Sequence, residues 1–186
     1  PRYHAGQYLL IERAGSEPAA FSLASAPHCG RELELHILGR EASSQELLAQ
    51  LQRDGLARIQ LPFGDTHLAE LPEGPLVLIA AGTGMAQMHS LIEHCRAAGF
   101  KYPVHLYWGA RTAADFYELP HWQEWQTLAN LRVQRVVSED PHWPGRRGLL
   151  HAAVREDFAD LKPLHVYASG SPGMVYATLD ALVEAG

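Results

Sequence analysis

A glycine-rich turn after an apolar run is the clearest chemical feature of the sequence. Leu76 to Ala80 reads LVLIA, a buried-type strand, and Gly82, Thr83 and Gly84 follow it at the start of a helical stretch. Glycines let a backbone approach a diphosphate closely, and the free N–H groups of a helix's first turn favour negative charge. An ordinary strand-to-helix turn explains two glycines at this spacing equally well. Gln87 stands where the full Rossmann fingerprint has its third glycine.

A second glycine-bearing turn lies at the other end of the same predicted sheet. Val166 to Met174 reads VYASGSPGM, in which Gly170, Ser171 and Pro172 separate a strand from a helix start. Ligands of open parallel sheets sit beyond the carboxyl ends of the strands. The two turns are therefore expected to open on the same side and to face one dinucleotide.

A third segment, Pro18 to Pro27 (PAAFSLASAP), belongs to strand-like sequence. Phe21 offers a flat apolar surface to a planar ring, and Ser22 offers a hydroxyl at the edge of that ring. An ordinary strand with Phe21 in the core is the simpler interpretation of these residues taken alone.

The histidines and cysteines, which could bind a metal or carry redox chemistry, do not occur at the spacings of a metal or disulfide site. None of the 11 histidines forms a His-Glu-x-x-His pattern, and His89 and His94 fall on different faces of one predicted helix. Cys29 and Cys95 are the only cysteines, too few for a disulfide framework or an iron–sulfur cluster within the chain. We predict no metal site.

Composition narrows the class of protein. The 186 residues are 47% hydrophobic, enough for a real core, and the net charge of -6 comes without a basic stripe, so we predict no nucleic-acid partner. No apolar run reaches the roughly 20 residues that span a bilayer, and no basic leader precedes an apolar stretch. We therefore predict a cytoplasmic protein without a membrane partner. Because the chain begins at Pro1, we expect it to be a fragment with sequence missing upstream.

The predicted secondary structure that must position these residues differs between the first and the second part of the chain. Short strands separated by glycine and proline are predicted at Gln7–Glu12, Ala20–Ala24, Glu32–Leu38 and Ala57–Leu61, a pattern typical of an antiparallel barrel. One helix interrupts them; Ser43 or Ser44 is its expected cap, and it ends before Gly55.

After Pro72 strands alternate with helices, which indicates a parallel sheet wound with crossovers. The sequence predicts strands at Leu76–Ala80, Val104–Trp108, Arg132–Val137 and His165–Ala168. It predicts helices from the glycine turn to about Ala98, at Leu119–Leu128, at Leu149–Phe158 and from Gly173 to the end. We place the domain boundary so that residues 1–72 form one domain and 73–186 the other.

Seven short motifs occur in the order in which the ferredoxin-NADP reductase superfamily has them: GQYL (6–9), FSLAS (21–25), LELHI (33–37), PFG (62–64), AGTGMA (81–86), YWGAR (107–111) and GSPGM (170–174). The chain resembles this superfamily over nearly its whole length. It is most similar to the branch of NAD(P)H-flavin reductases and CDP-6-deoxy-3,4-glucoseen reductases, in which Trp143, Gly145, Arg146 and Gly148 also have counterparts.

The resemblance implies a fold and an activity. The fold is a partial antiparallel flavin-binding barrel, incomplete at its N-terminus, followed by a parallel-sheet, Rossmann-like NAD(P)-binding domain that is incomplete at its C-terminus. The activity is that of a flavin-dependent NAD(P)H oxidoreductase, which passes hydride to flavin N5 and electrons onward to free flavin or to an iron–sulfur protein or domain. A [2Fe-2S] domain is expected only in sequence missing upstream.

The resemblance also assigns site residues. Ser22 and Ser169 would act at the reacting atoms. Flavin would contact Phe21, Ser22, His36, Ile37, Ser43 and Ser44. The dinucleotide diphosphate would contact Gly82, Thr83 and Gly84, its adenosine half Arg111, and its nicotinamide Gly170, Ser171 and Pro172.

Three departures from the family pattern qualify these assignments. Ala19 replaces an arginine that holds flavin phosphate, Ser169 replaces a frequent cysteine, and Gln87 replaces a proline. Loss of that arginine predicts weakly held flavin. A degenerate electron-transfer or binding subunit that needs a partner is therefore the alternative to an active enzyme. The choices between NADH and NADPH and between FAD and FMN are open.

Overall fold

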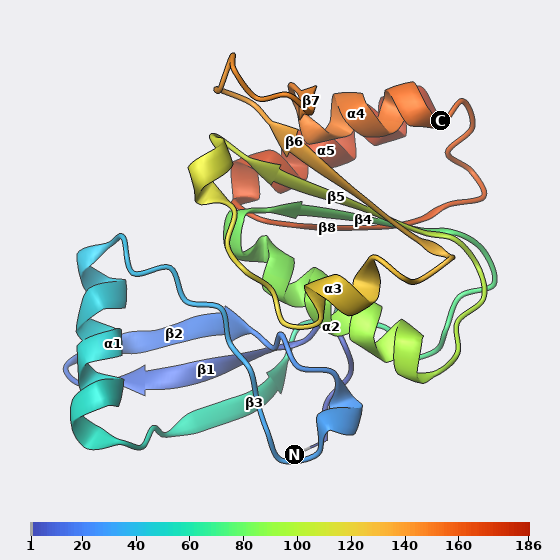
Figure 1. The fold of residues 1–186 in the computed structure, drawn as a ribbon. Helices are drawn as coiled ribbons and strands as arrows, with labels where there is room; N and C mark the ends of the chain where they lie inside the picture. Colours follow the sequence, from blue (N-terminus) through green and yellow to red (C-terminus); the bar gives the residue numbers. More distant parts are fainter. Residues whose placement is uncertain (1) are drawn as a thin grey trace.

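The computed structural model describes residues 2–186, which form two sheets with helices around them (Figure 1). The first sheet is antiparallel and has the order β2-β1-β3, with β1 at Tyr8–Arg13, β2 at Ser16–Ser22 and β3 at Ile59–Phe63. Helix α1, Ala42–Asp54, covers one end of this sheet and inserts the buried Leu47 among the apolar side chains of the strands. The strand-rich half of the prediction is confirmed as an antiparallel sheet.

Two details of this half differ from the sequence prediction. Glu32–Leu38 is not a strand, because its backbone bonds only locally: Ala24 donates to the Glu34 carbonyl, and a single bridge joins Leu23 to Leu35. Helix α1 begins one residue before Ser43, with Glu41 at its cap. The predicted serine cap is wrong, since Ser43 and Ser44 lie inside the first turn and no side chain caps the helix.

The second sheet is wholly parallel and has the order β7-β6-β5-β4-β8. Its strands are β4 at Leu76–Ala81, β5 at Val104–Ala110, β6 at Leu131–Val137, β7 at Arg146–Arg147 and β8 at His165–Ser169. The predicted strands are confirmed, and only the two-residue β7, too short for any periodicity, is missed. Strand β8 pairs directly with β4, so the two glycine turns lie beside each other and not at opposite ends of the sheet.

Helices cover both faces of the parallel sheet. Helices α2 (Met85–Ala97) and α3 (Trp122–Trp125) lie on one face, and α4 (Leu150–Asp157) and α5 (Pro172–Ala185) lie on the other (Figure 1). Helix α3 is far shorter than the predicted Leu119–Leu128, because His121 takes a left-handed conformation directly after Pro120.

Helix α2 joins the two sheets through buried polar side chains. Gln87 Nε2 donates to the carbonyls of Gly6 at 2.9 Å and Thr66 at 3.0 Å. His89 donates to the Ala24 carbonyl at 2.9 Å, and Ser90 donates to the Ser25 carbonyl at 2.8 Å. A buried carbonyl without a partner is unfavourable, so these bonds fix the helix to the strand-rich half.

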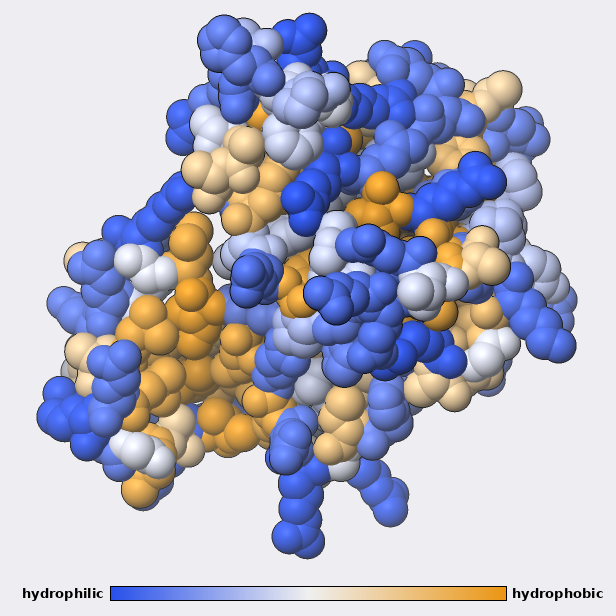
Figure 2. Space-filling model, in the orientation of Figure 1, coloured by the Kyte–Doolittle hydropathy of each residue, from blue (hydrophilic) through white to orange (hydrophobic). Residues whose placement is uncertain are grey.

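Apolar side chains gather over the three-stranded sheet on the face shown in Figure 2. Residues 2–186 contain no helix with both the length and the apolar character to cross a bilayer. In the same range, no group of three or more histidine, cysteine or acidic side chains is placed to hold a metal ion.

Candidate active site

Two glycine turns stand side by side at the carboxyl edge of the parallel sheet, because β4 and β8 pair in register from Leu76 to Ala80. A side chain at Gly84 would place its Cβ 2.2 Å from the carbonyl oxygen of Ser169, so only glycine lets the turns approach this closely. Gly82 has a left-handed φ of +54°, with open space where a side chain would stand. The turns therefore present backbone without side chains to the space beyond the carboxyl edge of the sheet.

A hollow of about 540 Å³ lies between these turns and the strand-rich half; we call it the barrel-side hollow. It brings together ten of the residues predicted for the site: Phe21, Ser22, His36, Ser44, Gly82, Thr83, Gly84, Ser169, Gly170 and Ser171. Residues from four separate segments of the sequence thus meet in one place.

A second hollow of about 350 Å³ runs along the carboxyl edge of the sheet toward the end of β6; we call it the sheet-side hollow. Arg111, the predicted adenosine contact, lines it together with Ser138 and Gly109. The two hollows share six lining residues, so they form one continuous groove: Leu38, Arg40, Ala81, Gly82, Thr83 and Ser171. The groove has at its centre the bare backbone that the diphosphate of a bound dinucleotide requires.

Three predicted site residues line neither hollow. Ile37 lies between two residues that do, Ser43 is exposed in the first turn of α1, and Pro172 opens α5. Their neighbours His36, Ser44 and Ser171 line the groove instead.

Residues Arg40 and Asp115 form an ion pair across the groove, and Arg111 binds Glu139 through two bonds of 2.9 and 2.8 Å. Bonding to Arg40, then to Thr112, lowers the pKa of Asp115 to about 2, and bonding to Arg111 lowers the pKa of Glu139. Both carboxylates are therefore charged at neutral pH and neutralise the arginines beside the groove.

A hydrogen bond of 2.8 Å between His36 Nδ1 and the Tyr117 hydroxyl links the strand-rich half to the parallel-sheet half beside the groove. The other ring nitrogen of His36 lies 2.9 Å from Glu34. Burial lowers the pKa of His36 and raises the pKa of Tyr117, so both side chains stay neutral near pH 7.

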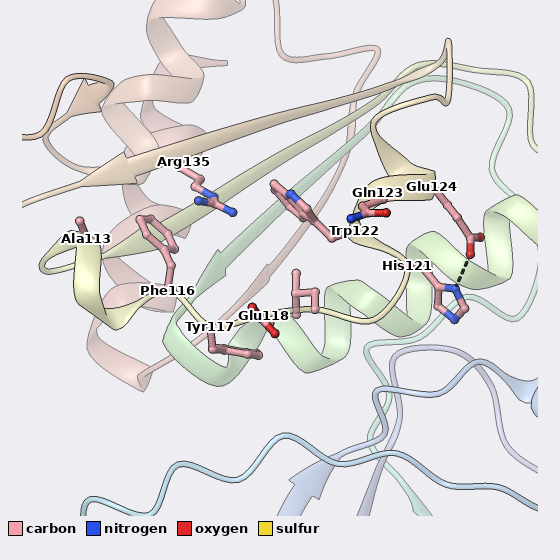
Figure 3. Close-up of a pocket in the computed structure, with 10 residues that line it drawn as sticks. Ala113, Phe116, Tyr117, Glu118, His121, Trp122, Gln123, Glu124 and Arg135 are labelled. Carbon is pink, nitrogen blue, oxygen red and sulfur yellow. Dashed lines mark hydrogen bonds and ion pairs between the residues drawn. The ribbon is translucent and has the colours of Figure 1, made fainter.

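A third hollow, of about 600 Å³, opens on the α3 side of the sheet, and Tyr117 also lines it (Figure 3). The guanidinium of Arg135 points into this space between aromatic rings, 4.5 Å from the Trp122 centroid and 5.2 Å from that of Phe116. These stacked contacts hold the loop from which Tyr117 reaches His36.

Sequence reasoning missed several residues of the groove, of which Leu38, Arg40, Asp115 and Tyr117 are the most informative. Leu38 is the last residue of a predicted strand, and Arg40 lies between that strand and α1; a basic residue just before a helix start was a usable signal for Arg40. Asp115 and Tyr117 lie in a connecting loop and carry no such signal.

The surroundings of Ala19 bear on the prediction that the flavin phosphate is held weakly. Ala19 pairs with Ile11 and packs against the apolar core of the strand-rich half, so β2 offers no cation there. The first turn of α1 supplies polar groups at this end of the groove, with Ser44 among the lining residues, whereas Arg40, which also lines it, is paired with Asp115. The groove therefore suits a phosphate through residues other than the family's arginine.

An antiparallel sheet that faces the glycine turns of a parallel sheet is the architecture of ferredoxin-reductase-type oxidoreductases. Residues 78–180 match the family described as the oxidoreductase NAD-binding domain. The chain belongs to this ferredoxin-reductase-like family of NAD-binding oxidoreductases.

The individual relatives agree with this family. The chain is 38% identical to an NAD(P)H-flavin reductase of Vibrio harveyi, over 98% of the chain and 81% of the relative. It is 33% identical to the CDP-6-deoxy-L-threo-D-glycero-4-hexulose-3-dehydrase reductase of Yersinia pestis, over 100% of the chain and 56% of that protein.

Among solved structures, the Amycolatopsis cytochrome P450 reductase GcoB matches with a TM-score of 0.86 and 30% identity, over 98% of this chain and 57% of its own. A Neisseria gonorrhoeae ferredoxin NADP+ reductase with bound FAD and NADP shares the fold, with a TM-score of 0.77 at 18% identity. The chain spans most of the Vibrio relative and a little over half of the Yersinia and Amycolatopsis proteins.

Proposed function

We propose that the protein transfers hydride from NADH or NADPH to a flavin, FAD or FMN, bound in the barrel-side hollow, and passes electrons onward to an acceptor. The main observation behind this proposal is that the two hollows share part of their lining. Gly82, Thr83 and Ser171 line both, so a dinucleotide along the groove would extend one end into the barrel-side hollow. Reductase relatives of known name support the same activity.

Phe21 and Ser22 stand at the end of β2, opposite Ser169 and Gly170 across the barrel-side hollow. Phe21 would pack against the flavin ring system, and the Ser22 hydroxyl would hydrogen-bond at its edge. Bound flavin would accept the hydride there, which is chemistry that the side chains do not supply. Ser169 and Gly170 would border the nicotinamide and hold it near that edge.

The phosphates would lie at the two helix starts. Gly82 to Gly84 offers bare backbone N–H groups to the dinucleotide diphosphate at the start of α2. The first turn of α1, with Ser44 lining the hollow, would hold the flavin phosphate. The adenosine half would occupy the sheet-side hollow beside Arg111.

The electron acceptor, free flavin or an iron–sulfur protein or domain, belongs to this proposal, as do the division into domains 1–72 and 73–186 and a cytoplasmic location. The location is supported by two unpaired cysteines, of which Cys95 is buried and Cys29 exposed.

A second candidate function is a degenerate subunit that has lost tight flavin binding and needs a partner. Ala19 favours it, because its methyl group faces an apolar core where the family has a cation.

The two candidates are separated by the visible spectrum of the purified protein, recorded with and without added FAD or FMN, followed by anaerobic addition of NADH or NADPH. An active reductase turns yellow and is bleached by the reduced nucleotide. A protein that stays colourless with either flavin, or whose bound flavin is not bleached, contradicts the enzyme and supports the subunit.

A further inference from the structure

We infer that the sheet-side hollow selects NADH over NADPH, and that Glu139 sets this preference by neutralising Arg111. The inference rests on the proposed function, because it takes the sheet-side hollow as the place of the adenosine half.

The orientation of a dinucleotide in the proposed complex follows from the residues that line each end of the groove. Its nicotinamide end lies between the β2 end and the β8 turn, at Ser22 and Ser169. From Gly82 the groove continues into the sheet-side hollow, which is also lined by Arg111 and Ser138, directly after β5 and β6. In parallel nucleotide-binding sheets, an acidic residue in this region binds the ribose 2'-hydroxyl, whereas an arginine accommodates a 2'-phosphate. The charges around Arg111 therefore decide between the two dinucleotides.

Arg111 is paired with a carboxylate through two of its three guanidinium nitrogens. Its Nε and Nη2 reach the two oxygens of Glu139 at 2.9 and 2.8 Å, a fork-to-fork geometry that occupies one edge of the guanidinium and sets a negative charge directly against its positive one. This pair joins the loop after β5 to the loop after β6 at the open edge of the hollow, and Glu139 directly follows Ser138, which lines it.

The second arginine of the hollow is also engaged. Arg40 is paired with Asp115, and Asp115 is fixed in turn by the backbone N–H of Thr112 at 2.9 Å and its hydroxyl at 3.0 Å. The positive charges of the two arginines, Arg40 and Arg111, are balanced by the negative charges of their carboxylate partners. These four side chains therefore carry no net charge at this end of the groove. No other lysine or arginine of residues 2–186 lines the hollow.

The arginines of β7 do not change this balance. Arg146 is held by Glu156 and Asp157, each at 2.6 Å, and Arg147 donates to the carbonyl of Pro141. A 2'-phosphate would bring close to two negative charges to an end without net positive charge. Ribose hydroxyls, in contrast, donate to carboxylates at no electrostatic disadvantage.

The test measures binding alone, by titrating NAD+ and NADP+ calorimetrically into the full chain at low ionic strength, where exposed charges act most strongly. We expect NAD+ to bind at least about tenfold more tightly. In Glu139→Gln the released Arg111 is expected to strengthen NADP+ binding about threefold to tenfold and to leave NAD+ binding within about twofold. Glu156→Gln is the matched control, since it frees part of Arg146 outside the hollow and leaves the ratio unchanged.

Three results overturn the inference. NADP+ binding as tightly as NAD+ to the unchanged protein removes the preference. An equal change for both nucleotides in Glu139→Gln, or the same change in Glu156→Gln, removes the role of Glu139. If neither nucleotide binds to protein with an intact circular dichroism spectrum, the dinucleotide site itself fails, and the proposed function fails with it.

Discussion

The amide nitrogen of Gln87 lies 2.9 Å from the carbonyl oxygen of Gly6, a residue 81 positions earlier in the chain. The same nitrogen donates to Thr66 at 3.0 Å, so one side chain at the start of α2 satisfies two backbone carbonyls of the strand-rich half. A glycine or proline at position 87 has no such donor. The departure from the family pattern at this position is thus a polar link between the two halves.

Gln87→Met keeps the size of the side chain and removes both bonds. We expect the free energy of unfolding to fall by about 1 to 3 kcal/mol, because the buried Gly6 carbonyl and the partly buried Thr66 carbonyl lose their donor. Urea denaturation followed by circular dichroism measures the change. Gln126→Met, at an exposed position, is the control and should have little effect. Equal stability of both variants would show that the link contributes nothing.

The close approach of the two glycine turns gives a second prediction. Gly84→Ala places a methyl carbon 2.2 Å from a backbone carbonyl oxygen of Ser169 that cannot rotate away. We expect a loss of stability of about 3 kcal/mol and weaker binding of NAD+, because the turns must separate. Gly173→Ala is the control, since its Cβ meets nothing within 4 Å. Unchanged melting and NAD+ titration curves for Gly84→Ala would contradict the described contact.

Long, strongly patterned elements were predictable from the sequence. The apolar run of β4 and the alternation of strands and helices after it specify a parallel sheet, because both faces of such strands are buried. The carboxyl-edge rule then places Gly82 and Gly170 at one site without any knowledge of strand order.

The sequence predictions that failed concern residues whose partners are distant in the sequence. Glu32–Leu38 alternates like a strand, yet strand formation needs a neighbouring backbone, and only Leu35 finds a bridge. The pairs Arg40–Asp115 and Arg111–Glu139 join segments 75 and 28 residues apart. No local pattern signals such pairs, so the electrostatics of the groove emerge only from the fold.

Burial of His36 predicts a dependence of stability on pH. Because its pKa is lowered in the folded protein, its contribution is fully present above its ordinary pKa of 6.5 and is lost as pH falls through the folded value. The neighbouring Glu34 opposes this shift and His89 adds to it. We expect His36→Gln to flatten the fall in unfolding free energy below pH 6.5, measured by urea denaturation at several pH values. His142→Gln, at an exposed position, is the control, and identical slopes in both variants would refute the assignment.

The aromatic surroundings of Arg135 predict an effect on stability. Its guanidinium stacks on Trp122, Phe116 and Trp108, at 4.5, 5.2 and 5.7 Å from the ring centroids. Arg135→Ala is expected to lower the unfolding free energy by about 1 to 2 kcal/mol. The exposed Arg132 of the same strand provides the control Arg132→Ala. Thermal unfolding that distinguishes neither variant from the unchanged protein would show that the stacking is not stabilising.

The proposed role of Ser22 predicts a kinetic effect without a binding effect. Ser22→Ala removes a hydroxyl at the end of β2 that lines the barrel-side hollow, while Phe21 and the glycine turns stay in place. A hydrogen bond worth about 1.4 kcal/mol in the transition state corresponds to a roughly tenfold slower reduction of bound flavin. Anaerobic stopped-flow absorbance with saturating NADH gives this rate, and its dependence on NADH concentration gives the nucleotide affinity, which should not change. Ser16→Ala, at the exposed start of the same strand, is the control. A reduced affinity with an unchanged limiting rate would place Ser22 in nucleotide binding and not at the reacting atoms.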